Sequence, residues 1–266
     1  MRVSSLILLY FMFMRLPCLF SLALLVAFGT ISQGQTKELH IAAAADLQPV
    51  LPTLAQAYEH ATGIKIVASF GSTATLTQQL LNGDPQDVFL AADFTHPEQL
   101  VAANLTVEHN PVPYAKGVLV LWARKDSPIQ PLTLDALTDP RVQKIAVAND
   151  QHAPYGVAAT KVLAALHLTD KVAGKLVVAE NIAQTAQFAE SGNAQVGLIS
   201  LTIASSPHFR EIGTFVRFPN VYPAIRQCGV TLKASKNQGT AQDFLRWLTS
   251  KDVQESLQKM GLDPAE

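Results

Sequence analysis

The chain has 266 residues, of which 48% are hydrophobic and 15% charged, so it can bury a sizeable core and does not belong among disordered or fibrous proteins. It carries 20 basic and 21 acidic side chains, and this near balance excludes a surface built to bind nucleic acid or another polyanion. Of its two cysteines only Cys228 lies beyond the apolar leader, so no internal disulfide is expected in the rest of the chain.

The first thirty-five residues are nearly all apolar and carry two arginines but no acid, which is typical of an export signal. We therefore expect residues 1–35 to be a signal peptide and the protein to be periplasmic. A start at Met14 would give a leader of more ordinary shape, with a short basic region before the apolar stretch. An uncleaved membrane anchor is the alternative, because about 20 apolar residues can span a bilayer.

Beyond the leader, short β-rich apolar runs alternate with segments of helical periodicity, which predicts an α/β fold with largely parallel sheets. Four strand and helix units carry this pattern, with strands expected at 38–43, 64–70, 144–148 and 176–179. Two more buried strands are expected, at 87–92 and 196–200. A helix should follow each of the first four strands, and the sheets should gather their carboxyl ends on one side.

Two extended apolar segments, 114–123 and 222–232, have no hairpin partner nearby. We interpret them as the connections that carry the chain from one lobe to a second lobe and back. A closing helix that includes Phe244 and Leu257 should then pack on the first lobe. The expected lobes are 36–115 together with 225–266, and 116–224, with a ligand cleft between them.

Small, neutral residues stand where each of four strands gives way to its helix, at 44–46, 71–73, 153–156 and 181–183. Ligands of open α/β sheets bind at the carboxyl ends of strands, and helix N-termini offer free amides and a partial positive charge of about half an elementary charge. Several such ends in one cleft would bind an anion without lysine or arginine. Taken singly, a serine or threonine there is a plain N-cap, and a tyrosine there an interfacial side chain.

In their order and residue types these clusters resemble the molybdate-binding periplasmic proteins of ABC transporters, the ModA family, over essentially the whole chain beyond the leader. The matching stretches are AAAADL, SFGSTATLTQQLLNGDPQDVFLAAD, VPYAKGVLVLWA, NDQHAPYGVAATKVL and AENIAQTAQFAESGNAQVGLIS. The resemblance implies a type II periplasmic binding protein fold of two α/β lobes. It also implies a monomeric protein, without a cofactor or catalytic residues, that captures molybdate or tungstate and delivers it to the permease of an ABC transporter.

In that family, hydroxyls and backbone amides of these loops hold the oxyanion, so molybdenum is bound as molybdate through the same residues. Carried over by motif, the resemblance implies six oxyanion-binding residues: Ala45, Asp46, Ser72, Thr73, Tyr155 and Ile182. Thr73 is preferred to Ser72, Tyr155 would contribute its phenolic hydroxyl, and Ile182 its amide. Where some relatives place a binding tyrosine after the last strand, this chain has Ser200.

Asp46 also departs from the family pattern, since many relatives have a serine there. An ionised carboxylate about 4 Å from a unit of negative charge costs about 4 kcal/mol at an effective dielectric constant of 20, and a dianion doubles that. We therefore expect Asp46 to turn away and cap its own helix by accepting from Gln48, which leaves the amides of Asp46 and Leu47 for the ligand. A protonated Asp46, or one that coordinates an expanded molybdenum centre, is the alternative.

Two other functions compete with this one. An enzyme acting on a small anion is the first, but the sequence has no GxSxG, GK[ST] or HExxH motif and no paired cysteines. His152 lies beside the proposed site, as a solvated loop residue or, in an enzyme, a catalytic one. A binding protein for another solute, such as sulfate or an organic acid, is the second. Organic acids usually require an arginine clamp, which the candidate loops lack.

Overall fold

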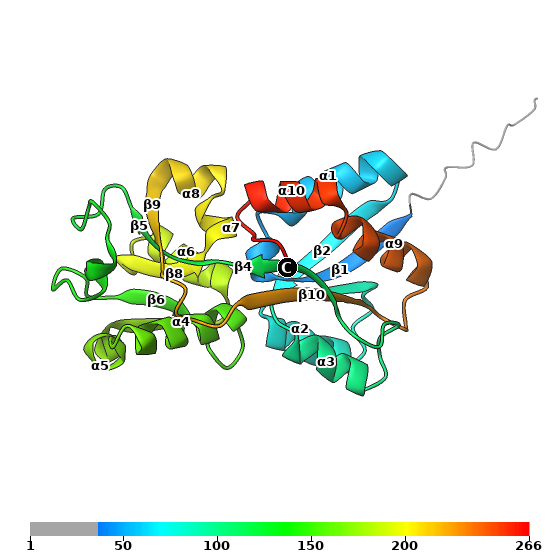
Figure 1. Ribbon diagram of the computed structural model, residues 1–266, viewed down its shortest axis with the longest axis horizontal. Helices are drawn as coiled ribbons and strands as arrows, with labels where there is room; N and C mark the ends of the chain where they lie inside the picture. Colours follow the sequence, from blue (N-terminus) through cyan, green and yellow to red (C-terminus); the bar gives the residue numbers. More distant parts are fainter. Residues whose placement is uncertain (1–36, 266) are drawn as a thin grey trace, which may run out of the picture. The chain divides into compact units, whose positions relative to one another are not determined.

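The computed structural model describes residues 37–265, so the signal peptide predicted at 1–35 lies outside the described part of the chain. Two five-stranded sheets organise the described residues (Figure 1). The first sheet contains, in spatial order, β2 (Lys65–Gly71), β1 (Glu38–Ala44), β3 (Val88–Ala91), β10 (Ile225–Thr231) and β4 (Val112–Gly117). The second contains β7 (Leu176–Ala179), β6 (Ile145–Ala148), β8 (Val196–Ser200), β5 (Leu119–Arg124) and β9 (Gly213–Arg217).

Four strands of each sheet run in the same direction, and one runs against them. The exceptions are β10, which pairs antiparallel with β3 and β4, and β5, which pairs antiparallel with β8 and β9. Each is the first strand that the chain forms on arriving from the other sheet. The structure thus confirms the predicted α/β fold of two mostly parallel sheets, a type II binding protein fold.

Helices cover both faces of the first sheet (Figure 1). On one face lie α1 (Leu51–Thr62), α9 (Gln238–Leu248) and α10 (Lys251–Lys259), and on the other lie α2 (Thr73–Leu81) and α3 (Thr95–Ala102). The first face buries an aromatic cluster in which the Tyr58 ring lies 5.1 Å from that of Phe244 and 5.0 Å from that of Trp247, between centroids. Edge-to-face contacts of this kind add to the apolar area that the helices remove from water.

One continuous apolar core supports the second sheet. Its helices are α4 (Pro154–Ala165), α5 (Thr169–Val172), α6 (Ile182–Glu190), α7 (Leu201–Ala204) and α8 (Pro207–Ile212). Short 3-10 turns complete the described chain: η1 (Ala45–Leu47), η2 (Leu134–Leu137) and η3 (Ala173–Lys175). Among residues 37–265 no helix combines the length and apolarity needed to cross a membrane.

Three sequence expectations need correction. The segment 114–123 is not one strand: it breaks at Val118, because Gly117 still pairs with β10 of the first sheet whereas Leu119 already pairs with β8 of the second. The closing helix is two helices, separated at 249–250. Helix α3 and strand β9 were not expected. The lobe boundaries at 36–115 with 225–266 and at 116–224 stay a prediction.

The contact between Gly213 and Trp122 gives a test of the second core. Trp122 is fully buried in β5, and a Cβ atom added to Gly213 on the neighbouring strand would overlap its indole ring. We expect Gly213→Ala to lower the free energy of unfolding by about 1–3 kcal/mol, because an overpacked core must shift rigid groups. Urea unfolding measures the change. Gly174→Ala, where an added Cβ meets no atom within 4 Å, is the control and should leave stability nearly unchanged.

Candidate functional site

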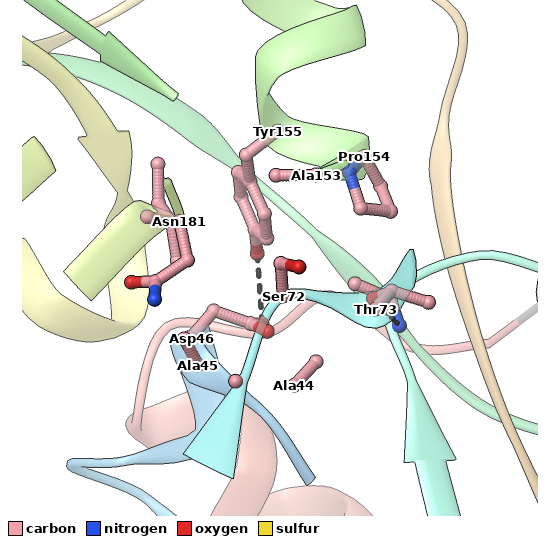
Figure 2. Close-up of a pocket in the computed structure, with 12 residues that line it drawn as sticks. Ala44, Ala45, Asp46, Ser72, Thr73, Ala153, Pro154, Tyr155 and Asn181 are labelled. Atoms are coloured by element: carbon pink, nitrogen blue, oxygen red, sulfur yellow. Dashed lines mark hydrogen bonds between the residues drawn. The ribbon is translucent and has the colours of Figure 1, made fainter. Parts of the chain in front are cut away.

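A small pocket, with a cavity volume of about 10 Å³, lies where the carboxyl ends of strands from both sheets meet (Figure 2). Its wall consists of the last residues of β1 and β2 and of residues that follow β1, β2, β3, β6 and β7: Ala44, Ala45, Asp46, Gly71, Ser72, Thr73, Ala92, Ala153, Pro154, Tyr155, Asn181 and Ile182. All six residues predicted from the sequence are among them. Among residues 37–265, those that line the wall include no lysine or arginine, and Asp46 supplies the one ionisable carboxyl group.

The helix starts at the pocket are shaped by local capping. Ser72 is the N-cap of α2: its Oγ accepts from the amide of Thr75 at 3.2 Å and donates to the Thr75 hydroxyl at 2.7 Å. Asn181 is the N-cap of α6, where its carboxamide oxygen accepts from the amides of Ala183 and Gln184, both at 3.0 Å. The amide of Ile182, the first residue of α6, is not used by this cap.

Thr73 and its neighbour Ser72 differ in whether the hydroxyl hydrogen is available to donate to a ligand. The Thr73 Oγ1 accepts from the amide of Ala92 at 3.3 Å, and within residues 37–265 no acceptor takes its own hydrogen. The Ser72 hydroxyl, in contrast, has acceptors in Thr75 and, at 3.4 Å, in Glu180. Of the two hydroxyls, that of Thr73 is therefore the free donor at the pocket.

Asp46 is fully buried and connects the two sheets. Its Oδ2 accepts from the Tyr155 hydroxyl at 3.0 Å, drawn as the dashed line in Figure 2, and from Gln227 Nε2 at 2.5 Å. Its main-chain carbonyl accepts from the Thr202 hydroxyl at 2.7 Å. The second carboxyl oxygen, Oδ1, is buried and has no hydrogen-bond partner among the described residues.

The expectation that Asp46 caps its own helix is wrong. Asp46 lies inside the 3-10 turn η1, whose N-cap is Ala44, and the amide of Gln48 donates to the carbonyl of Ala45 at 3.2 Å. The tight turn satisfies that amide through the main chain, so the carboxyl group is left to bind partners that are distant in sequence. The predicted presence of Asp46 at the pocket is nonetheless what the structure shows.

Burial sets the ionisation behaviour of this group of residues. Removal from water raises the pKa of Asp46 from 3.8 to about 6, although the hydrogen bonds from Gln227 and Tyr155 oppose the rise. Burial, with the nearby Asp46 charge, also holds the pKa of Tyr155 and of Tyr114 well above the usual value for a phenol. Both tyrosines therefore stay protonated, and Tyr155 acts as a hydrogen-bond donor to Asp46.

A second cross-sheet contact lies beside the pocket. Glu180, which follows β7, accepts from the Thr75 hydroxyl of α2 at 3.0 Å and pairs with His152 Nδ1 at 3.1 Å. The amide of Ala74 also donates to the main-chain carbonyl of His152 at 3.1 Å. The hydrogen bond from His152 lowers the pKa of Glu180. His152 is thus a half-exposed partner of Glu180 at the start of the two helices.

Sequence reasoning missed Gln227, Thr202, Glu180 and Ala92. The signal for Gln227 is present in the sequence, since it is a polar residue within the otherwise buried end of the return strand. The register of β10 with β4 shifts between Gln227 and Cys228, however, and such an irregularity is not visible in the sequence. Ala92 is the last residue of the strand predicted at 87–92, whereas the observed strand β3 ends at Ala91 and leaves Ala92 just beyond it, at the pocket.

Comparison with known proteins agrees with this geometry. A family model described as bacterial extracellular solute-binding protein matches residues 39–263. The molybdate-binding protein ModA of Azotobacter vinelandii is 35% identical over 247 residues, which cover 91% of this chain and 98% of that protein. ModA of Rhodobacter capsulatus is 28% identical over 240 residues, which cover 90% and 93%. The solved structure of the Azotobacter vinelandii periplasmic molybdate-binding protein matches with a TM-score of 0.79 and 30% identity, covering 84% of this chain and 98% of that one.

Two mostly parallel β-sheets are flanked by helices, and a small pocket lies at their strand ends. This arrangement defines a binding protein of the type II periplasmic class. The matches extend over most of both chains, and not over a shared motif alone. The chain therefore belongs to the bacterial extracellular solute-binding protein family, in its ModA branch.

The raised pKa of Asp46 makes the stability of the ligand-free protein depend on pH. The folded-state value of about 6 lies above 3.8, so the wild type loses stability as pH rises through this window and has lost all of the contribution above it. Since a tenfold change in an equilibrium is about 1.4 kcal/mol, the loss amounts to about 3 kcal/mol. We expect Asp46→Asn to raise the free energy of unfolding by up to this amount at pH 8.

Urea unfolding between pH 4 and pH 8 measures this effect, and the difference between the two proteins should shrink as the pH falls. Glu255→Gln, which changes an exposed carboxylate on α10, is the control. A gap between wild type and Asp46→Asn that stays constant over the whole range would contradict the expected ionisation of Asp46.

Proposed function

We propose that this protein binds molybdate or tungstate outside the cytoplasm and delivers it to the permease of an ABC transporter. The observation that carries the proposal is a pocket at the strand ends of both sheets whose wall offers hydroxyls and main-chain amides and contains no cationic side chain. Membership of the ModA branch, whose named relatives are molybdate-binding proteins, supports the same ligand. We further propose a monomer that acts in the periplasm, without catalysis and without a cofactor.

Neutral donors suit this ligand because a deprotonated tetrahedral dianion has four acceptor oxygens and no hydrogen to give. Hydrogen bonds to a charged acceptor contribute about 1.5–3 kcal/mol each, so a few of them exceed the cost of ordering a small ion. Helix N-termini at the pocket add favourable partial charge. We assign the oxyanion to the space between Ala45, Asp46, Ser72, Thr73, Tyr155 and Ile182.

Within this assignment the Thr73 hydroxyl and the Ile182 amide are the first donors to the ligand. The hydrogens of the Ser72 and Tyr155 hydroxyls already have acceptors in the protein, in Thr75 and Asp46 respectively. Ser72 and Tyr155 therefore hold the wall in place as well as bordering the ligand. Discrimination between molybdate and sulfate, which have the same charge and shape, must come from the size of the space.

Titration calorimetry of residues 36–266 with molybdate, tungstate, sulfate and phosphate in turn tests the ligand class. We expect saturable binding of molybdate and tungstate with one ion per chain, and weaker binding of the two smaller oxyanions. Binding of sulfate or phosphate alone, with no response to molybdate or tungstate, would assign the pocket to another oxyanion. Turnover of generic phosphoesters by the same preparation would contradict a purely binding function.

The two neighbouring hydroxyls provide a matched pair of variants. We expect Thr73→Val to weaken molybdate binding about tenfold to a hundredfold, because it removes a donor to a charged acceptor while conserving shape. Ser72→Ala should act mainly on stability, by about 0.5–2 kcal/mol, because it removes the N-cap of α2. Calorimetry and urea unfolding of both variants measure the two effects. If Ser72→Ala loses binding and Thr73→Val does not, the assignment of the free donor is wrong.

A further inference from the structure

Of the two carboxyl oxygens of Asp46, one has hydrogen-bond donors and the other has none among the described residues. Oδ2 has two donors, the Tyr155 hydroxyl and the Gln227 carboxamide, whereas Oδ1 is buried and has no partner within residues 37–265. A buried polar atom without a partner is costly, and it marks a place where another group can bind. Asp46 is also one of the residues that line the pocket, so a ligand bound there would lie beside this residue and is a candidate partner for Oδ1.

The charges at the pocket do not balance if Asp46 is ionised. An oxyanion with two negative charges would then lie beside a buried carboxylate, and no lysine or arginine of the wall could compensate the three charges. Like charges at short distance in a poorly screened site repel strongly. A carboxylate oxygen is also an acceptor, and a deprotonated oxyanion has no hydrogen to donate to it.

We propose that capture of the oxyanion is coupled to the uptake of one proton by Asp46, whose neutral carboxyl group then donates a hydrogen bond from Oδ1 to the ligand. The proton comes from the solvent, it adds to Oδ1, and no other bond is formed or broken. Oδ2 keeps its two donors. This inference rests on the proposed function, since it requires a fully deprotonated oxyanion as the ligand.

Asp46 is the group that takes up the proton, because the titratable groups around it are already protonated or are paired elsewhere. Tyr155 of α4 and Tyr114 of β4 are already protonated phenols, and the thiol of Cys228 on β10 is buried, with its pKa raised by burial. Of the other elements, α6, α7 and β2 pack most closely against η1. Helix α7 has no titratable side chain, Glu190 at the end of α6 pairs with His208, and Lys65 at the start of β2 pairs with Glu38.

The His152 and Glu180 pair is the other titratable unit near the site. It lies outside the residues that line the pocket, and both side chains are close to half exposed. The pKa of Asp46 is about 6 in the ligand-free protein, so only a small free energy is needed to protonate it at neutral pH. The neutral carboxyl completes a wall of donors, which favours molybdate or tungstate. An ionised Asp46 would instead favour an oxyanion that carries a hydrogen, such as hydrogen phosphate.

Calorimetry in buffers of different ionisation enthalpy measures the number of protons taken up per ion bound. For wild-type protein and molybdate we expect about half a proton at pH 6 and close to one at pH 8, with the affinity falling about tenfold per pH unit above pH 6. Molybdate binding with no proton uptake and a flat pH profile would overturn the proposal and leave the proposed function intact. Absence of molybdate and tungstate binding by the folded protein would instead remove the proposed function.

The Asp46→Asn variant tests whether Asp46 is the group that takes up the proton. The asparagine side chain does not titrate, and its amide can donate a hydrogen bond at every pH. We expect its binding to take up no proton, to be independent of pH between 6 and 8, and to be about a hundredfold tighter than wild type at pH 8. His152→Gln is the matched control and should retain the uptake. Uptake that persists in Asp46→Asn overturns the proposal. The wild-type buffer series tests it even if Asp46→Asn does not fold.

Discussion

The hydrogen bonds that Oδ2 of Asp46 accepts from Tyr155 and Gln227 unite three distant parts of the chain. Asp46 follows the first strand, Tyr155 opens a helix of the second sheet 109 residues later, and Gln227 lies on the return strand 181 residues away. A buried carboxyl group is costly unless it is hydrogen-bonded. Asp46 therefore needs these two donors, because the packing of the two sheets removes it from water. The hydrogen bond between Tyr155 and Asp46 thus joins a pocket residue that follows the first sheet's β1 to one that follows the second sheet's β6.

The topology explains why such a contact can form. Each sheet receives one strand that runs against the others, and that strand is the one that enters from the opposite sheet. The parallel strands therefore keep their carboxyl ends on the side that faces the partner sheet, with a helix start after most of them. In the part of the chain that the structure describes, helix starts line the pocket and no cationic side chain does, which is the property that suits a small dianion.

Much of the fold could be predicted from the sequence because apolar periodicity and small residues at strand ends are local signals. Strands β7 and β8 have the predicted bounds, and α4 begins at the predicted Pro154. The break at Val118 could not be seen, because it depends on which sheet each neighbouring residue pairs with. The motifs predict six oxyanion-binding residues, and the structure brings all six to one pocket; their contact with an oxyanion stays a prediction.

The hydrogen-bond partners of Asp46 could not be predicted from the sequence, for a different physical reason. Sequence proximity suggests a local cap for an aspartate before a helix, but the partners of Asp46 are Tyr155 and Gln227, which tertiary packing brings to it from distant parts of the chain. The sequence did show that a charged carboxylate beside the ligand is unfavourable. What it could not show is that one carboxyl oxygen would have two donors and the other none.

The position of Gly117 has a consequence for the partners of Asp46. It lies at the end of β4, where the chain leaves the first sheet, and an added Cβ there would overlap the Tyr155 hydroxyl. The crossing point of the chain thus touches the phenol that donates to Asp46. Any larger residue at position 117 would displace that hydroxyl, so the absence of a side chain where the backbone crosses is a condition for the hydrogen bond between Tyr155 and Asp46.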